Sequence, residues 1–443
     1  MNSYLKCVNQ KCGKEYPILS TDFKCSCSNL LDVKYKNSPS SNLKEVFYKR
    51  RNPEGSIFNE SGVWRFRELL NFCEIDTEDL EQCSENLVSL DGSEGRQSKP
   101  YHMSKVASFV GIDNERLMLQ PEGYNPSGSF KDNGMSAAVT HAKMVNAKKI
   151  ICASTGNTSA SAGMFAANEN MECDVYIPEG EISPGKLSQA YQFGTQMIHV
   201  KGTFDDAFIK SLDASKESGS YTVNSINPFR IEGQKTIPYR ALEFLNWEVP
   251  DWIVYPGGAL GNTSSCGKCI MELYEWGWIK KIPRIAVINA EGANTLDVLY
   301  NGKFEDTELR WNKGDPNVEL IDQYYSKMND DGIRPQTKAT AIQIGKPANI
   351  LKGLRALEFT NGVVTSVTDN EMLDGMSVVG LNGFDCEMAS GAVPAGVKKL
   401  LGEGTIKKDD TVIGILTGRQ KEPLLPIEYH NDISNKFARP PKK

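Results

Sequence analysis

The strongest constraint on the fold is a regular alternation of short β-rich runs with amphipathic helices, which begins near Tyr101 and continues to about residue 418. The runs are RLMLQ, KKIICAS, CDVYIP, QMIHVKG, SYTVNS, DWIVYPG, RIAVINA, GVVTSV and TVIGILTG. Strands that alternate with helices indicate parallel sheets joined by crossover connections. Ligands of such sheets bind beyond the carboxyl ends of the strands.

Length and charge exclude several classes of function. The chain has 443 residues, so we expect two or three domains. A net charge of −6 gives no basic footprint, and we expect no nucleic-acid partner. We expect no membrane partner either, because no apolar run approaches the roughly 18 residues of a membrane span. The first residues, MNSYLKCVNQ, lack an apolar signal core, which favours a cytoplasmic location.

One lysine lies in an unusual local sequence, NPSGSFKDNGM, which starts at residue 125. We expect Ser129 to cap a helix and Asp132 to form a capping-box pair with it, so that Lys131 falls in the first turn. The positive end of the helix dipole and partial burial both disfavour an ammonium group there. Lys131 is therefore a candidate Schiff-base former, and a solvated first-turn lysine is the alternative.

Four further segments place polar residues or glycines where a strand ends. They are ASTGNTSAS, VNSINPFRIEGQKT, VYPGGALGNTSS and TVIGILTG, which ends one residue after Thr417. Such strand ends suit an anion or a hydroxylated ring. The glycine-rich segment lacks the signatures of nucleotide-binding loops, which favours the phosphate of a small cofactor. Arg230 is a natural partner for a phosphate or carboxylate. Ordinary polar turns and a structural salt bridge are the alternatives.

Four cysteines near the start have the spacings C-x4-C and C-x-C: Cys7, Cys12, Cys25 and Cys27. Four thiolates can close a tetrahedral zinc site, and a ribbon that folds without metal is the alternative. The total of eleven cysteines is odd, and most are scattered, which favours reduced thiols over a disulfide framework. His141 lies on the expected helix of Lys131, where we expect it to pack rather than to act in catalysis.

Taken in order, these segments resemble the fold-type II pyridoxal-phosphate (PLP) enzymes, whose fold is that of tryptophan synthase β. Among them the chain is most similar to the threonine synthases, through GVWRFRELL, NPSGSFKDNGM, STGNTSAS, NPFRIEGQKT, ATAIQIGKPANILKGLRAL and SGAVPAG. The similarity covers nearly the whole chain, including the cysteine-containing start. The chain departs from the family at Asn133, which is usually Arg, and at TGRQKEP, which is usually the longer TGHGLKDP.

The resemblance implies a lyase that converts O-phospho-L-homoserine and water to L-threonine and phosphate. Lys131 would hold pyridoxal 5'-phosphate as a Schiff base and act as the catalytic base. The other implied cofactor contacts are Asn157 to the ring hydroxyl, Gly258, Ala259, Leu260, Gly261 and Asn262 to the phosphate, and Thr417 to the pyridine nitrogen. The implied contacts to the substrate phosphate are Ser154, Thr158, Asn224 and Arg230. A neutral hydroxyl at position 417 would leave the pyridine nitrogen largely unprotonated.

The resemblance also implies an α/β fold with two parallel-sheet domains, a cysteine-containing extension and a homodimer. We place a zinc-ribbon-like segment at 1–40, the first part of the large domain at 41–137, a small α/β domain at 138–235 and the large PLP-binding domain at 236–443. The cofactor would lie in the cleft between the two domains. We further expect a helix in VWRFRELLNF and an irregular surface excursion over 302–340.

Three other functions stay open. A serine/threonine dehydratase of the same fold usually carries His where Thr158 stands. Arg230 would have no obvious function in such an enzyme. A cysteate-synthase-like enzyme would use O-phosphoserine and sulfite with the same phosphate-binding residues. A non-catalytic metabolite-binding protein is disfavoured because Lys131, Asn157 and Thr417 are all intact.

Overall fold

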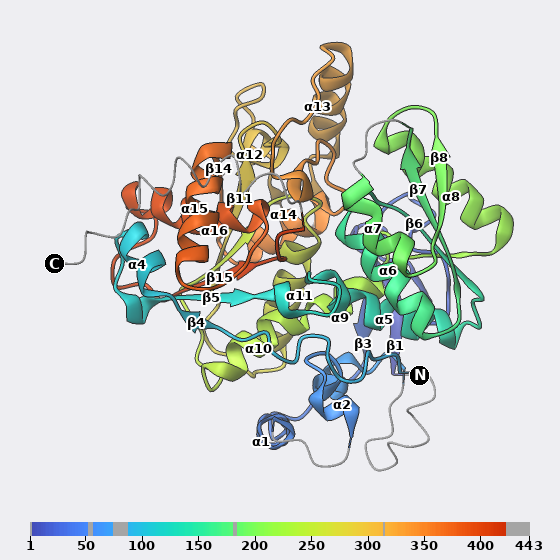
Figure 1. The fold of residues 1–443 in the computed structure, drawn as a ribbon, viewed down its shortest axis with the longest axis horizontal. Helices are drawn as coiled ribbons and strands as arrows, with labels where there is room; N and C mark the ends of the chain where they lie inside the picture. The colour runs from blue at the N-terminus through green and yellow to red at the C-terminus, as the bar shows by residue number, and fades with distance from the viewer. Residues whose placement is uncertain (1, 52–55, 74–86, 180–183, 313–314, 422–443) are drawn as a thin grey trace.

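The computed structural model describes residues 2–51, 56–73, 87–179, 184–312 and 315–421, and it shows two α/β regions side by side (Figure 1). All nine β-rich runs predicted from the sequence form strands. Within both larger sheets the strands pair in parallel, apart from one edge strand. These parallel sheets and their connecting helices confirm the α/β fold class.

The larger sheet has six strands in the order β14–β11–β10–β15–β5–β4. They are β4 (Tyr101–His102), β5 (Leu117–Pro121), β10 (Trp252–Pro256), β11 (Arg284–Ala290), β14 (Val363–Val367) and β15 (Val412–Leu416). Only the edge strand β4 runs antiparallel to its neighbour. The helices of this region are α4 (Ser104–Val110), α10 (Thr236–Phe244), α11 (Gly261–Glu275), α12 (Thr295–Tyr300), α14 (Ile350–Phe359), α15 (Asp369–Leu381) and α16 (Met388–Gly402).

Helices cover both faces of the six-stranded sheet, which explains why its central strands are apolar throughout. Along β10, Ile253 and Tyr255 pack in one core with residues of α11 and α14. The alternate residues Trp252 and Val254 pack in a second core with residues of α15 and α16. The whole strand β10 is buried, so the loop that follows it starts from a fixed point.

The smaller sheet has four parallel strands in the order β8–β7–β6–β9. They are β6 (Lys149–Ala153), β7 (Glu172–Pro178), β8 (Gln196–Val200) and β9 (Tyr221–Thr222). Its helices are α5 (Lys131–Met144), α6 (Asn157–Asn168), α7 (Pro184–Gln192), α8 (Phe204–Ser218) and α9 (Pro228–Gln234). The predicted domain boundaries after residues 137 and 235 fall inside α5 and between α9 and α10, and the division into domains stays a prediction.

The N-terminal segment forms a three-stranded antiparallel sheet of β2 (Glu15–Pro17), β1 (Ser3–Cys7) and β3 (Leu31–Tyr35). Buried charges join it to the larger region. Asp32 pairs with Lys352 of α14 at 2.9 Å, and Lys268 of α11 donates to the Val33 carbonyl at 2.5 Å. His141 of α5 packs as predicted, between the Tyr221 hydroxyl and the Ile18 carbonyl.

Two expectations about secondary structure need correction. The helix predicted in VWRFRELLNF is the short 3-10 helix η1 (Trp64–Leu70), because Phe66 has non-helical dihedral angles. The segment 302–340 is not irregular throughout, since it contains β12 (Trp311–Asn312), β13 (Asp315–Pro316) and α13 (Val318–Asp330). Leu320, Ile321 and Met328 form a buried face of α13 that its many charges obscured in the sequence.

The remaining short elements connect the sheets. They are α1 (Leu43–Arg50), α2 (Ile57–Glu60), η2 (Asn114–Arg116), η3 (Glu122–Tyr124) and η4 (Thr340–Ile342). Among the described helices, none combines the length and the apolar character needed to cross a bilayer.

Candidate active site

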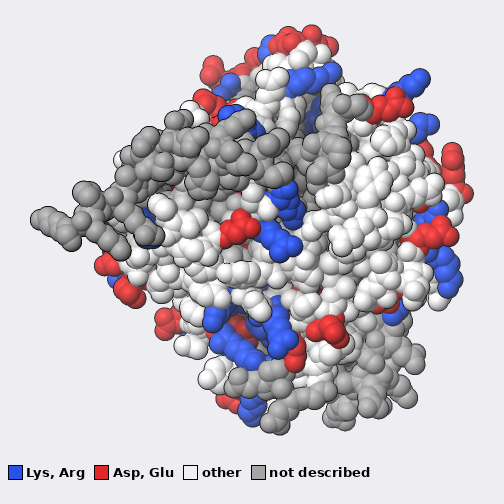
Figure 2. Space-filling view, in the orientation of Figure 1, with Lys and Arg blue, Asp and Glu red and all other residues white. Residues whose placement is uncertain are grey.

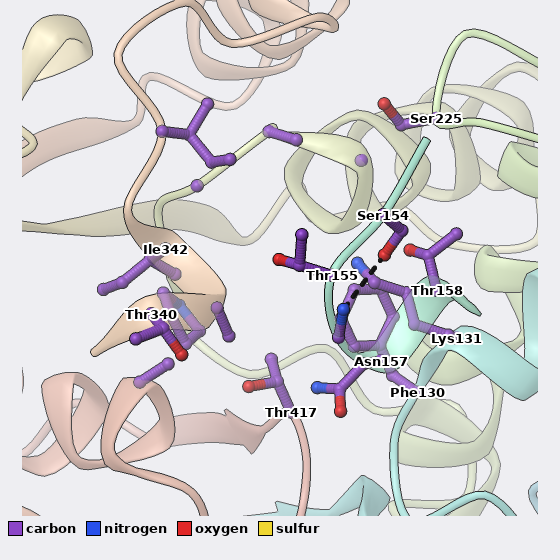
Figure 3. A pocket seen from close by; sticks show the side chains of 18 of the residues that line it. Phe130, Lys131, Ser154, Thr155, Asn157, Thr158, Ser225, Thr340, Ile342 and Thr417 are labelled. Atoms are coloured by element: carbon purple, nitrogen blue, oxygen red, sulfur yellow. Dashed lines mark hydrogen bonds between the residues drawn. The ribbon is translucent and has the colours of Figure 1, made fainter. Parts of the chain in front are cut away.

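A cavity of about 280 Å³ is lined by residues that directly follow strands of both larger sheets. Its walls include the segments after β6, β9, β10 and β15, together with the start of α5. Figure 3 shows Lys131, Ser154, Asn157 and Thr158 grouped on one side, with Thr340 and Ile342 opposite. The structure thus brings together every residue predicted to contact the cofactor or the substrate, and places the four cysteines elsewhere.

The cavity is positively charged although the whole chain is acidic. Its basic lining residues are Lys131, Arg230, Lys338, Lys346, Arg419 and Lys421, and its acidic ones are Asp205 and Glu387. In the space-filling view, basic side chains are visible near the middle of the face, where the two regions of Figure 1 meet (Figure 2). An excess of positive charge in a recess favours an anionic ligand.

Lys131 is the first residue of α5, as expected, but the predicted cap is wrong. The N-cap residue is Phe130, and the Asp132 carboxylate forms no capping box with Ser129, although the Asp132 N–H donates to the Ser129 carbonyl at 3.4 Å. Instead the Asp132 carboxylate accepts hydrogen bonds from the Ser127 N–H at 2.7 Å and from its hydroxyl at 2.6 Å. These bonds close the NPSGS turn onto the helix and hold Lys131 at the cavity wall.

The amine of Lys131 is electrostatically disfavoured as an ammonium group. Burial, followed by the positive charge of Arg230, lowers its pKa to about 7, against the attraction of Glu387. Its Nζ atom lies 3.9 Å from the centroid of the Phe130 ring. Near neutral pH the amine is therefore available both as a nucleophile and as a base.

The glycine-rich loop after β10 forms a backbone cradle at the start of α11. Leu260 adopts a left-handed conformation with φ of 62°, which turns the chain into the helix. A Cβ atom at Gly258 would lie 3.1 Å from the Ile342 Cα atom, so a larger residue would press on η4. Thr263, in the first turn, is buried, and its hydroxyl has no partner among the described residues. Free N–H groups at this helix start suit a phosphate.

Arg230 offers a second site for an anion in the same cavity. The residue is 1 % exposed, and its Nη1 donates to the Val223 carbonyl at 3.0 Å. Its Nε has no hydrogen-bond partner within the described part of the chain. Ser154 lies nearby, where its Oγ accepts from the N–H groups of Gly156 and Ser159, both at 3.3 Å. Its hydroxyl hydrogen is therefore free to be donated to a ligand.

Asn224 reaches the same wall but is already engaged. Its Oδ1 accepts from the Ala153 N–H at 3.0 Å, and its Nδ2 donates to the Ala153 carbonyl at 2.8 Å. These bonds tie the end of β6 to the end of β9. Direct contact of Asn224 with a substrate phosphate therefore stays a prediction, and its visible contacts are structural.

The sequence interpretation missed several charged residues of the cavity, and two of them, Glu387 and Lys421, hydrogen-bond to predicted site residues. Glu387 accepts from the Asn157 amide at 2.9 Å and from the Thr417 hydroxyl at 2.8 Å. Lys421 donates to the Asn157 Oδ1 atom at 2.9 Å. The available signal for Glu387 was an acidic residue directly before a helix of small residues, MASGAVPAG. That pattern is also typical of an ordinary helix start, so it did not stand out.

The four N-terminal cysteines converge although their spacing is irregular. The Sγ atoms of Cys7, Cys12, Cys25 and Cys27 all lie within 4.8 Å of one another. Burial opposes ionisation of Cys25, but hydrogen bonds from the Cys27 N–H and the Tyr16 hydroxyl prevail and lower its pKa to about 6. Four sulfur atoms at this separation fit a tetrahedral metal ion.

Comparison with known proteins agrees with this geometry. Residues 100–418 match the family model described as "Pyridoxal-phosphate dependent enzyme". The threonine synthase of Methanocaldococcus jannaschii is 35% identical over 415 residues, which are 93% of this chain and 91% of that protein. The threonine synthase of Methanosarcina acetivorans is 33% identical over 96% of this chain and 94% of its own length.

Solved structures with low sequence identity share the fold. The fungal L-serine ammonia-lyase from Rhizomucor miehei has a TM-score of 0.59 at 17% identity, covering 76% of this chain and 97% of that one. The processed threonine deaminase isoform 2 from Solanum lycopersicum has a TM-score of 0.56 at 14% identity, with coverage of 90% and 95%. These similarities place the chain in the predicted fold type.

Proposed function

The chain belongs to the pyridoxal-phosphate-dependent enzymes and, among them, to the threonine synthases, and on this premise we propose that it converts O-phospho-L-homoserine and water to L-threonine and phosphate in the cavity around Lys131. The observation that carries the proposal is the presence of two separate anion sites in one cavity. The start of α11 suits the phosphate of the cofactor, and Arg230 suits the phosphate of a substrate.

The residues present fit pyridoxal 5'-phosphate. A lysine with a pKa of about 7 can hold its aldehyde covalently. The loop from Gly258 to Thr263 can hold the cofactor phosphate. The Thr263 hydroxyl is buried without a partner among the described residues, and Gly258 lies close to η4. Asn157 and Thr417 bring an amide and a hydroxyl to the same cavity for its ring. When bound, the cofactor supplies an electron sink for negative charge on the substrate.

The side chains of this protein supply proton transfer and binding of the leaving phosphate. Because the pKa of Lys131 is close to 7, the same amine can remove a proton from the substrate Cα and return one later. Arg230, with Ser154 and Thr158 beside it, would bind the leaving phosphate and stabilise its charge. Burial of this phosphate site keeps solvent away from the charged groups and strengthens their interaction.

One assay separates this function from its rivals. Purified protein loaded with the cofactor is offered O-phosphohomoserine, O-phosphoserine with sulfite, or threonine alone. We expect phosphate and threonine from the first mixture only. Phosphate release from O-phosphoserine that depends on sulfite would support a cysteate-synthase-like enzyme, and keto acid from threonine would support a dehydratase. A colourless protein that takes up no cofactor would favour a binding protein.

We also propose that the cysteine cluster holds a structural zinc ion, supported by the mutual approach of the four Sγ atoms. Protein purified without added metal should contain one zinc ion per chain, as measured by elemental analysis. Replacing Cys12 and Cys25 by serine should release the metal and lower the thermal stability, whereas Cys73→Ser should leave both unchanged. A wild-type protein of full stability without zinc would show that the ribbon folds without metal.

The predicted homodimer rests on the resemblance alone. Light scattering of the loaded enzyme gives its mass directly, and we expect twice the mass of the chain. A fully active monomer would overturn this prediction. The predicted cytoplasmic location and the absence of a nucleic-acid partner likewise stay predictions.

A further inference from the structure

We propose that Gln234 is a further ligand of the cofactor phosphate, so that the single helix α9 contributes a side chain to each of the two phosphate sites. The inference rests on the proposed function, because it concerns the cofactor of that site. Gln234 belongs to the segment NPFRIEGQKT, and the sequence alone assigned it no role.

The side chain of Gln234 is a buried polar group with an unsatisfied atom. The residue is 2 % exposed and lines the cavity, and its Oε1 atom has no hydrogen-bond partner among the described residues. A polar atom buried without a hydrogen bond destabilises the folded protein. Such an atom at the wall of a cavity indicates that a ligand completes the hydrogen bonding of the side chain.

Two glycines show where the amide of Gln234 lies. A Cβ atom at Gly261, the first residue of α11, would lie 3.1 Å from its Oε1 atom. A Cβ atom at Gly134, three residues after Lys131 in α5, would lie 2.8 Å from its Nε2 atom. The amide is therefore beside the start of α11, where the first N–H groups have no partner inside the helix and suit a phosphate.

An amide supplies the donor that a phosphate needs. A phosphate ester is ionised at neutral pH and presents acceptor oxygens. The amide carries one acceptor oxygen and an NH₂ group with two donors, and rotation about the Cγ–Cδ bond exchanges their positions. With a phosphate bound at the start of α11, we expect the Nε2 atom of Gln234 to face it and to donate.

The position of Gln234 on α9 relates the two phosphate sites. Arg230 and Gln234 are four residues apart, which places both side chains on one face of the helix. Every residue of α9 is buried, and the helix packs against α5 and α11. Arg230 would bind the substrate phosphate and Gln234 the cofactor phosphate, so one buried helix would set the distance between them. The cation then serves the phosphate that leaves, and the neutral amide serves the one that stays.

The test compares pyridoxal 5'-phosphate with pyridoxal, which lacks only the phosphate. The full chain, freed of cofactor, is titrated with each compound, and the absorbance change gives the two dissociation constants. In Gln234→Met, which keeps the length of the side chain but has no donor, the affinity for pyridoxal 5'-phosphate should fall about 10-fold or more. In Gln234→Glu, a carboxylate beside the phosphate should cause a larger loss. The affinity for pyridoxal should be unchanged in both variants.

The ratio of the two dissociation constants within one variant separates phosphate binding from a general loosening of the fold. Gln189→Met is the matched control, because Gln189 also lines the cavity but donates to the Ser127 carbonyl, and its ratio should equal that of the wild type. An unchanged ratio in both Gln234 variants would overturn the inference. The proposed function would still hold if the wild type binds pyridoxal 5'-phosphate and forms threonine from O-phosphohomoserine, and it would fail if the wild type does neither.

Discussion

At the scale of single residues, Lys131 combines catalytic use with a cost in stability. Burial and the neighbouring Arg230 lower its pKa to about 7, which means that the folded protein disfavours its charged form. A buried side chain whose charged form is disfavoured in this way is typical of active sites. Its removal should therefore affect activity and stability in opposite directions.

We predict that Lys131→Ala lowers turnover by at least about 10³-fold, because both covalent attachment of the cofactor and proton transfer are lost. The thermal midpoint of the cofactor-free protein should stay the same or rise. Turnover of O-phosphohomoserine and differential scanning calorimetry measure the two effects. Lys143→Ala, at the other end of the same helix, where the lysine is partly exposed and pairs with Glu169, is the matched control and should retain activity. Normal turnover in Lys131→Ala would show that the lysine has another role.

Arg230 gives a second prediction at this scale. In Arg230→Ala the KM for O-phosphohomoserine should rise about 30-fold or more, since a buried partner of the phosphate is removed. The affinity for pyridoxal phosphate should change little, because the cradle at α11 is separate. Steady-state kinetics and absorbance titration of the cofactor give the two values. The reverse pattern, with the cofactor lost and the KM unchanged, would assign Arg230 to the cofactor or to the fold.

The site was largely predictable from residues that end strands or begin helices, and the residues that were missed have physical reasons. Lys131, Arg230 and the glycine-rich loop could be recognised as candidates from their residue types. All of them line one cavity. Glu387 was missed because its partners Asn157 and Thr417 are far away in the sequence and meet it only through the fold. The hydrogen bonds of Asn224 with Ala153 could not be predicted either, because Ala153 ends β6 and Asn224 follows β9, a different strand of the same sheet.

At the scale of elements, the N-terminal sheet is held by buried charges in addition to an apolar core, in which Leu5, Leu31 and Val33 share buried contacts with residues of α5. Burial alone would raise the pKa of Asp32, but Arg355 and Lys352 prevail and hold it well below its ordinary value. Lys352 is 1 % exposed, so neither partner is solvated if the pair is broken. Glu232 and Glu272 form a second cluster with Lys268 just beside it.

We predict that Asp32→Asn destabilises the protein by about 3 to 5 kcal/mol, because it leaves the buried Lys352 and the partly buried Arg355 without their carboxylate. Urea denaturation followed by fluorescence measures the change. The matched control is Asp331→Asn at the C-cap of α13, whose pair with Lys327 is exposed and should contribute less than about 1 kcal/mol. Equal small effects in both variants would show that the buried pair is not what fixes the sheet.

The pKa of Asp32 also determines how the stability of the protein changes with pH. The pKa of Asp32 is lower in the folded state, so its stabilising contribution is fully present above the ordinary value near 3.9 and is lost as the pH falls through the folded value. The stability difference between wild type and Asp32→Asn should therefore shrink on acidification below about pH 4.

Strands were easier to predict than helices in this chain. Parallel strands buried on both faces are apolar runs, and all nine were visible. The helix α13 was missed because its buried residues are few among many charges. The capping pair of Ser129 and Asp132 failed because Ser127 competes for the same carboxylate. Local motifs are reliable only where no nearby group offers a better partner.

At the scale of the whole molecule, the cavity joins the two larger sheets, because residues after β6 and β9 face residues after β10 and β15 across it. We predict that the cofactor stabilises both regions together. At free cofactor about 100-fold above its Kd, the free energy of unfolding should rise by about 2.7 kcal/mol. Calorimetry should show one transition that moves as a unit. Two transitions, of which only one shifts, would mean that the cofactor binds a single region.

The distance in sequence between Asp32 and its cationic partners has a consequence for synthesis on the ribosome. Arg355 follows Asp32 by 323 residues, which takes roughly 15 to 65 s at ordinary elongation rates. During that interval the first strands to leave the exit tunnel carry a carboxylate with nothing to neutralise it. Apolar contacts of the amino-terminal sheet with α5 can form early, but Asp32 meets its cationic partners only late in translation, and chaperones can bind the segment during that interval.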